Sequence, residues 1–404
     1  MIRKATAVTL AAAFLAMSMF VGTNAGAQDN HVKWSFLVYL AADNHLDGDV
    51  YGVPLVEDAL GQLMSVGSTD SVAVHALVDR HSEPDNLFKV NKGELVPMTG
   101  FFALSGTEFN TGDPNTLRSF VEYTESLAPA EYTSLIIWDS GSLGYIAKDV
   151  QGEPIHGYYN YDIVDYLTHQ EVVQALDGLN VDILGADECN IGYMEIAYEY
   201  AVHQTARYLV TAPTYIGWRG FPYDAILAEM TEHPDMDARH AAVMMVEQRQ
   251  LFLDQPPYQM ERTNAFSAID LAKVKDLASS LKVLTGLVTP KMADYINIVN
   301  KARSQANMAY AQNPMNRIDL MTFVKSLDAK SSEFDGALDA VISDLDAAVM
   351  ALQTTGTTDH MTSGLGIYMP NHPSELPDIY RVFAFPAEGW MAFLEAYWSA
   401  HGKT

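Results

Sequence analysis

The sequence predicts an α/β fold with a mostly parallel central sheet, followed by a mainly helical C-terminal lobe. Three observations lead to this prediction. Short β-rich runs alternate with helical patterns through the first half of the chain, and the segments between the runs are long enough for crossover helices. Beyond about residue 270 the apolar spacing becomes helical. We therefore expect an α/β domain over residues 28–265 and a helical lobe over residues 266–404.

Residues 1–27 have the pattern of a secretory signal peptide. Arg3 and Lys4 precede an apolar run over residues 7–21, and Ala25-Gly26-Ala27 fits a signal-peptidase site. The run is shorter than the roughly 18 apolar residues that a membrane-spanning helix needs. We expect cleavage after residue 27, export to the periplasm or the medium, and no membrane insertion of the mature chain.

The composition is strongly acidic and contains a single cysteine. Asp and Glu number 51 against 24 Lys and Arg, which gives a net charge of −27. Such a charge repels nucleic acid and anionic membranes, so neither is expected as a partner. One thiol cannot form an internal disulfide, so the core must supply the stability, and a chain that is 49% hydrophobic can bury a large core.

The expected elements of the first half follow each other in regular order. Strands are predicted at residues 34–40, 72–78, 135–138, 181–185 and 208–211. Crossover helices are predicted within residues 53–67, 115–127 and 171–179. A β-hairpin is predicted from the short runs 88–90 and 94–96, because Asn91-Lys92-Gly93 between them is a turn sequence.

The second half is expected to be helical. Its clearest pattern is an apolar stripe at 3.6-residue spacing, which predicts one helix whose stripe packs in the core and does not bind a cofactor. The stripe consists of Phe334, Leu338, Val341, Ile342, Leu345, Val349 and Leu352. A late strand over residues 364–369 and a final helix over residues 389–400 complete the expected elements.

Three polar loops are expected at the carboxyl edge of the sheet, where α/β folds bind ligands. They comprise residues 41–44, 139–141 and 186–189. Cys189 precedes a predicted helix over residues 191–201, whose N-terminus would favour the thiolate. We therefore predict a cysteine nucleophile with a partner from the 139–141 loop. The alternative is that Cys189 serves only as a small buried hydrophobe.

The segments around these loops resemble the clostripain family of cysteine peptidases, relatives of the caspases, gingipains and legumains. The similar stretches, in family order, are WSFLVYLAADNHLD, EFNTGDPNTLRSFVEYTESLAPAEYTSLIIW, VDILGADECNIGYMEIAYEY and GLGIYMP. The resemblance implies a caspase-like three-layer fold and a peptide or protein ligand, with a preference for basic residues.

The resemblance also implies roles for individual residues. Cys189 is the counterpart of the nucleophile, and Gly141 that of the glycine whose amide helps to form the oxyanion hole. Asp187 corresponds to the aspartate that receives an Arg or Lys side chain. Thr211 begins the segment that lines the same pocket, where Thr211-Ala212-Pro213 supplies no acid. Ser140 stands where the family has its catalytic histidine.

Loss of the histidine would impair catalysis. A free cysteine with a pKa near 8.5 is only about 3% thiolate at pH 7. General acid catalysis by the histidine is worth roughly 10²- to 10⁴-fold in rate. Glu188, where the family has alanine, places a further acid beside the thiol, and a nearby negative charge raises a thiol pKa.

Two hypotheses follow. The chain is a pseudopeptidase that binds peptide or protein segments, or it is an active endopeptidase that cleaves after Arg or Lys. In the second case, His156 on a Gly-containing loop would replace the family base, or the substrate would assist proton transfer.

No cofactor is expected, and calcium is compatible only with the resemblance, because some relatives need it. Asp43, Asp47 and Asp49 do not have the spacing of an EF-hand loop, so we interpret them as a solvated loop with a helix cap. Members of the family cut themselves at basic residues between base and nucleophile. Here that interval holds only Lys148, so a two-chain form is not expected.

Overall fold

The computed structural model describes most of the chain beyond the expected signal peptide, and residues 31–404 form one compact unit. Among the described residues, no helix is both long enough and apolar enough to cross a bilayer. The described residues are 31–50, 53–81, 84–101, 108–151, 163–214, 216–217, 219–253, 263–308, 316–327, 334–356 and 362–402.

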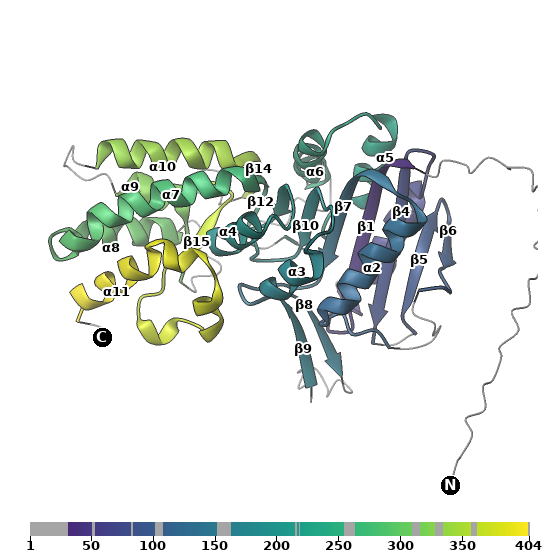
Figure 1. Cartoon of the computed structure of the whole chain (residues 1–404), viewed down its shortest axis with the longest axis horizontal. Helices are drawn as coiled ribbons and strands as arrows, with labels where there is room; N and C mark the ends of the chain where they lie inside the picture. Colours follow the sequence, from purple (N-terminus) through teal and green to yellow (C-terminus); the bar gives the residue numbers. More distant parts are fainter. Residues whose placement is uncertain are drawn as a thin grey trace, which may run out of the picture. The chain divides into compact units, whose positions relative to one another are not determined.

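A central sheet of nine strands organises the described part of the chain (Figure 1), in the order β14-β12-β11-β10-β7-β1-β4-β5-β6. Its five inner strands run parallel, which confirms the predicted mostly parallel sheet. Their bounds are β1 Val32–Ala42, β4 Val72–Arg80, β7 Ala130–Trp138, β10 Ile183–Asp187 and β11 Tyr208–Thr211. Each overlaps a run predicted from the sequence, and β10 lies two residues later than expected.

Four antiparallel strands extend the sheet at both edges. The predicted hairpin forms β5 Asn86–Asn91 and β6 Glu94–Pro97 beside β4. At the other edge, β12 Thr263–Asp270 pairs with β11, and β14 Val349–Gly356 pairs with β12. Strands from the C-terminal half therefore complete the sheet of the N-terminal half.

The prediction of one helix through residue 352 is wrong at its end. Helix α10 spans Asp335–Ala348, and Val349 begins β14. Leu352 is 41% exposed, so it does not belong to a buried helical stripe. Pairing with β12 determines the conformation of this segment, because tertiary context overrides the local helical periodicity.

Helices cover both faces of the sheet and give the three layers of the expected fold. Along β1, Leu37 and Tyr39 pack into a core with α2, α3 and α4, whereas Phe36 and Val38 pack into a second core with α1, α5 and α6. This alternation follows from the two-residue period of a strand. Figure 1 shows α2 lying over the face of β1 and β4. The helices are α1 Leu55–Val66, α2 Pro114–Leu127, α3 His169–Leu176, α4 Met194–His203, α5 Tyr223–Glu232 and α6 Ala238–Leu253.

The remaining helices belong to the C-terminal part, in agreement with the predicted helical pattern. They are α7 Leu271–Val288, α8 Met292–Met308, α9 Leu320–Ser326, α10 and α11 Trp390–Ala400, with 3₁₀ turns η2 Thr289–Lys291, η3 Pro373–Glu375, η4 Asp378–Val382 and η5 Phe385–Glu388. The late strand, β15 Gly366–Tyr368, pairs with β13 Arg317–Asp319 in a separate sheet. The N–H of Gly366 also donates to the carbonyl of Gly192 at 2.9 Å, so β15 supports the segment that follows Cys189.

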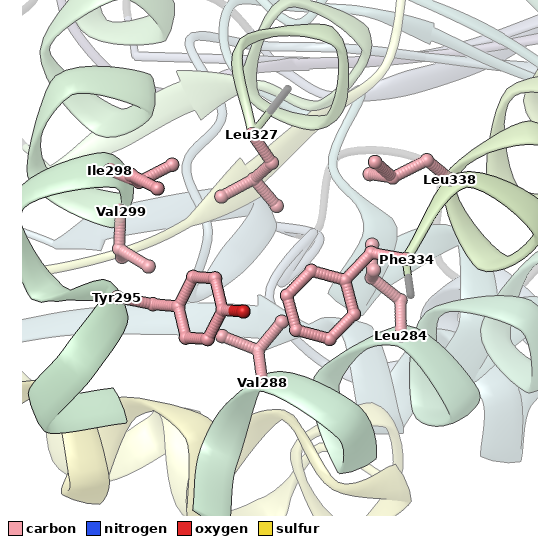
Figure 2. Close-up of a pocket in the computed structure, with 8 residues that line it drawn as sticks. All are labelled: Leu284, Val288, Tyr295, Ile298, Val299, Leu327, Phe334 and Leu338. Carbon is pink, nitrogen blue, oxygen red and sulfur yellow. The ribbon is translucent and has the colours of Figure 1, made fainter. Parts of the chain in front are cut away.

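The apolar stripe of α10 packs in the core, as predicted. Phe334 and Leu338 face α7, α8 and the end of α9 across a small cavity lined by eight side chains (Figure 2). Its volume is about 10 Å³, roughly that of one water molecule, and its lining is apolar. This cavity is a packing gap and not a ligand site.

Two small antiparallel pairs lie outside the large sheet. β2 Asp49–Val50 pairs with β3 Val53–Pro54, and β8 Tyr145–Gln151 pairs with β9 Ile163–Thr168. Strands β8 and β9 carry no clear pattern in the sequence and were not expected. The β8 strand matters for the site, because it follows directly on the loop that carries Ser140.

Candidate functional site

Two of the three loops predicted at the carboxyl edge of the sheet meet there, those that carry Ser140 and Cys189. Strand β7 ends at Trp138 and β10 ends at Asp187, and these two residues are paired neighbours in the parallel ladder. The chain therefore leaves the two strands side by side. Residues 139–141 and 188–189 follow at once, so the structure brings Ser140, Gly141 and Cys189 into one region, as expected.

Ser140 is bound to a lysine. The Nζ of Lys148 on β8 donates to Ser140 Oγ at 2.8 Å. The same ammonium group lies 4.0 Å from Asp139 Oδ1, and the Lys148 backbone N–H donates to Asp139 Oδ2 at 2.7 Å. Burial raises the pKa of Asp139 to about 6, and Lys148 opposes this rise. The Ser140 hydroxyl thus accepts a hydrogen bond from an ammonium group, which makes it a still poorer base than a free hydroxyl.

Cys189 is partly exposed and its thiol is not activated. Burial raises the thiol pKa above its usual value, and the charge of Asp187 raises it further. The Ile216 backbone N–H and the Arg249 charge act in the opposite direction without outweighing burial. At neutral pH the thiol form therefore dominates.

The predicted helix start beside Cys189 is wrong. Helix α4 begins at Met194 after an N-cap at Tyr193, whereas residue 191 was expected. The preceding segment is instead held by the residue that follows β11, because the backbone N–H groups of Ile191 and Gly192 both donate to the carbonyl of Ala212 at 3.0 Å. Since the helix dipole acts within the first turn only, Cys189 gains little stabilisation of its thiolate from α4.

Glu188 fills the space beside Gly141. It is fully buried, and neither carboxyl oxygen has a hydrogen-bond partner. Gly141 has a φ of +46°, and a Cβ built there would overlap the Glu188 carboxyl group. Burial raises the Glu188 pKa well above its usual value, and Asp139 and Asp187 add to the effect. The neutral acid is therefore favoured at the glycine expected to form the oxyanion hole.

Asp187 and Thr211 are enclosed. Asp187 Oδ2 accepts hydrogen bonds from the Phe221 N–H at 2.9 Å and the Tyr223 hydroxyl at 2.7 Å. Gly220 lies directly against the Asp187 carboxylate, which is 2% exposed. Burial raises the Asp187 pKa to about 6. Thr211 ends β11 and is fully buried. A basic side chain could reach Asp187 only if the Gly220 segment moved.

Two buried residues that the sequence analysis missed hold the loops of the site. His169 Nε2 lies 3.0 Å from the Ser142 carbonyl and Nδ1 lies 2.7 Å from the Tyr200 hydroxyl. A carbonyl only accepts, so Nε2 carries the proton and Nδ1 accepts from Tyr200. Burial lowers the His169 pKa to about 4, which suits this neutral form. Arg249 donates to the carbonyls of Ile216 and Gly220.

Other histidines and acids can also be placed. His156, the predicted substitute base, lies outside the described residues. His45 lies in the loop after β1, and burial followed by the charge of Lys148 lowers its pKa to about 4. Asp47 binds Arg80 Nη2 at 2.6 Å, so it does not contribute to a metal site. A carboxylate oxygen of Asp43 instead lies within 4.8 Å of one from Asp79 and one from Glu108.

Comparisons with known proteins identify the family and agree with the fold. A family model described as the clostripain family matches residues 38–399. The protein clostripain from Hathewaya histolytica is 27% identical over 248 residues, which cover 50% of this chain. That match spans 43% of the length of clostripain, less than two thirds of the relative.

Two solved structures have the same fold. One is a secreted cysteine protease from Bacteroides thetaiotaomicron in complex with an irreversible peptide inhibitor, with a TM-score of 0.64, 16% identity, and coverage of 89% of this chain and 99% of that one. The other is an inactive zymogen of a protease from Parabacteroides distasonis, with a TM-score of 0.62, 18% identity, and coverage of 88% and 98%. At these identities the likeness establishes the fold alone.

Proposed function

This chain belongs to the clostripain family of cysteine peptidases, and from that premise we propose that it is an exported, catalytically impaired member. It keeps the cysteine and binds peptide or protein segments without efficient cleavage. The proposed export rests on the signal-peptide pattern of residues 1–27.

The contact between Ser140 and Lys148 carries this proposal. The family reaction needs a base that takes the thiol proton and returns it to the leaving amine. At the corresponding position this chain has a hydroxyl that accepts a hydrogen bond from an ammonium group at 2.8 Å. An ammonium group has no lone pair, and a hydroxyl that accepts its hydrogen bond is a very weak base, so neither group is suited to take the thiol proton.

The surroundings of the thiol support the same conclusion. Burial raises the Cys189 pKa, and α4 begins too late to lower it through its dipole. The Glu188 carboxyl group occupies the space beside Gly141, where an oxyanion would need room and a free amide. Three requirements of the family reaction, namely a base, a thiolate and an oxyanion hole, are therefore impaired together.

The proposed ligand is a peptide or protein segment, with the family preference for Arg or Lys reduced. The Asp187 carboxylate already accepts hydrogen bonds from Phe221 and Tyr223 and lies beneath Gly220. A basic side chain would have to open this segment before it met the charge. Arg249 holds the segment at two carbonyls, which raises the cost of opening.

The test is to incubate the purified chain with an Arg- or Lys-directed thiol-reactive peptide probe and to measure the intact mass. We expect no stoichiometric labelling within minutes and no turnover of an Arg-peptide substrate. Cys189→Ala is the control for labelling elsewhere. Rapid labelling with turnover would overturn the proposal, and loss of that activity in His156→Ala would identify the active alternative.

A gain-of-function variant tests the same site in the opposite direction. Ser140→His alone would place an imidazole against the Lys148 ammonium group, so the informative variant is Ser140→His with Lys148→Ala. We expect its probe labelling to exceed that of a Ser140→Ala/Lys148→Ala control by about 10²-fold or more, the range of general acid-base catalysis. If Glu188 also blocks the reaction, adding Glu188→Ala should increase the labelling further.

A further inference from the structure

Arg317 brings a positive charge from the C-terminal half of the chain to the segment that carries Cys189. Arg317 begins β13, and β13 pairs with β15. In β15, the N–H of Gly366 donates to the Gly192 carbonyl at 2.9 Å, and Gly366 also forms a β-bridge with Tyr193. The guanidinium carbon of Arg317 lies 5.5 Å from the centre of the Tyr193 ring. The charge therefore lies beside the start of α4, directly after the Cys189 loop.

Tyr193 is fixed between Arg317 and the expected substrate pocket. Its hydroxyl donates to the Pro213 carbonyl at 2.6 Å, and the side chain is 1% exposed. Pro213 ends the segment 211–213 that is expected to line the pocket. The electrostatics agree with this placement, because burial raises the pKa of Cys189 and the charge of Arg317 is among those that oppose the rise.

Arg317 has no acidic partner within the part of the chain that the structure describes, and its Nε is buried without a hydrogen-bond partner. The other described arginines, apart from the exposed Arg381, form ion pairs or donate to carbonyl oxygens. They are Arg80, Arg118, Arg207, Arg219, Arg239, Arg249 and Arg303. The chain has 51 acids against 24 Lys and Arg, so a partly buried arginine without an acid is unexpected. It indicates that the partner of Arg317 comes from outside the chain.

The buried acid near Arg317 does not neutralise it. Glu195 on α4 accepts hydrogen bonds at Oε1 from the Tyr368 N–H at 3.0 Å and the Tyr380 hydroxyl at 2.7 Å, and its Oε2 has no hydrogen-bond partner. Burial foremost raises the pKa of Glu195 to about 7, although the Arg317 charge opposes the rise. A carboxyl group with this pKa is only partly ionised at neutral pH. The guanidinium group therefore remains available to an anion from solution.

We propose that Arg317 binds a carboxylate of the peptide or protein segment that occupies the site beside Cys189. This inference rests on the proposed function, because it names the chemistry of the same ligand. A guanidinium group donates two parallel hydrogen bonds to a carboxylate, and partial burial strengthens such charge-assisted bonds. Contact with the Tyr193 ring orders the Arg317 side chain before the ligand arrives, which lowers the entropy cost of binding.

The preferred ligand thereby differs from the basic peptide that the family resemblance implies. The Asp187 carboxylate is 2% exposed and lies beneath Gly220, whereas Arg317 is only partly buried. An incoming peptide therefore meets the guanidinium of Arg317 more readily than the carboxylate of Asp187. An Asp or Glu side chain and a C-terminal carboxylate both supply the group that Arg317 binds.

The experiment compares two reagents of different charge that alkylate Cys189. Iodoacetate carries a carboxylate and iodoacetamide is its neutral counterpart. Both react with the thiolate, so the thiolate fraction cancels from the ratio of their rates. We expect Arg317→Gln to lower the iodoacetate-to-iodoacetamide ratio on the order of tenfold relative to the natural chain. Arg381→Gln, at an exposed arginine in η4, removes the same charge from the chain and should keep the natural ratio.

The remaining outcomes separate this proposal from catalytic impairment. An unchanged ratio in Arg317→Gln, or an equal fall in Arg381→Gln, would overturn the role of Arg317. If Arg317→Gln fails to fold, Arg317→Met replaces it with the same expectation, because its unbranched side chain can still pack on Tyr193. Rapid labelling by both reagents would count against catalytic impairment alone, since the ratio does not depend on activation of the thiol.

Protection of Cys189 from iodoacetamide identifies the source of the carboxylate. Three N-acetylated alanine peptides are compared: one with a central glutamate and an amidated C-terminus, one with a central glutamine and an amidated C-terminus, and one whose sole charge is a free C-terminal carboxylate. We expect the glutamate peptide or the free-carboxylate peptide to protect at roughly tenfold lower concentration than the glutamine peptide, and Arg317→Gln to remove the difference. Equal protection by all three would overturn the carboxylate preference and leave peptide binding intact, whereas protection by none would overturn both.

Discussion

The carboxyl group of Glu188 occupies the position that a Cβ on Gly141 would take, so a buried acid fills the space beside the glycine expected to form the oxyanion hole. Gly141 reaches this position with a φ of +46°, which favours glycine. This contact links the two loops of the site, and it can be tested separately from catalysis.

Substituting Gly141 tests the contact. Gly141→Ala should destabilise the protein by about 2–4 kcal/mol, because the Cβ adds an overlap with Glu188 to the cost of a positive φ. Gly178→Ala is the matched control. The φ of Gly178 is +78° and no atom lies within 4 Å of the added Cβ. We therefore expect this substitution to lower the free energy of unfolding by only about 1 kcal/mol. Urea unfolding measures the free energy of unfolding of both variants. Equal losses of stability in the two would contradict the overlap with Glu188.

Substituting Glu188 tests its protonation. Its folded pKa is raised, so between its ordinary value of 4.5 and the folded pKa the folded state holds a proton that the unfolded state has lost. Glu188 should therefore cost stability progressively as pH rises through this window, by at most about 1.4 kcal/mol per pH unit. The Glu188→Gln side chain does not titrate in this range. The free energy of unfolding of this variant, measured in urea, should therefore rise relative to that of the natural chain as the pH increases. An advantage that is independent of pH would contradict the raised pKa.

The pH dependence of alkylation tests the thiol. Cys189 is the one cysteine of the chain, so the rate of iodoacetamide labelling reports on it alone. Since burial raises its pKa, labelling at pH 7 should be slower than for the same chain in urea, and the rate should still be rising at pH 9. A plateau below pH 7 would instead indicate an activated thiolate and would contradict catalytic impairment.

The chain should remain in one piece at Lys148. This residue lies inside β8, opposite Tyr166 on β9, and its side chain is 13% exposed. A protease needs an accessible segment that can unfold locally, and Lys148 is held by its strand and by Ser140. Intact mass after prolonged incubation, alone or with trypsin at low concentration, should show no cut after Lys148. Early cleavage there, before cuts at exposed sites such as Lys273, would contradict this prediction.

Much of the fold was accessible from the sequence because its signals are local. The five inner strands are short apolar runs bounded by turns, and the crossover helices have clear starts, such as Asp113 before Pro114 and the capping box from Thr168 to Glu171. The error at Val349–Gly356 arose where these signals were ambiguous, because the partner strand of that segment lies far away in the sequence.

The candidate site was only partly accessible for the same reason. Strand order explains why Ser140 and Cys189 come together, since both follow neighbouring parallel strands. The helical periodicity after Cys189 suggested a helix start that tertiary hydrogen bonds to Ala212 displaced to Met194. No periodicity indicates that Lys148 turns towards Ser140, or that His169 holds the Ser142 carbonyl.

The sequence by itself determined the layered α/β fold, the identity of the cysteine and the absence of a histidine at position 140, because each is a property of one residue or of a short pattern. Only the tertiary structure decided what surrounds them. Lys148 occupies the place beside Ser140, and Glu188 fills the space at Gly141. These arrangements depend on side chains from distant segments entering the same low-dielectric volume, where burial and neighbouring charges change their pKa values in ways that no single segment encodes.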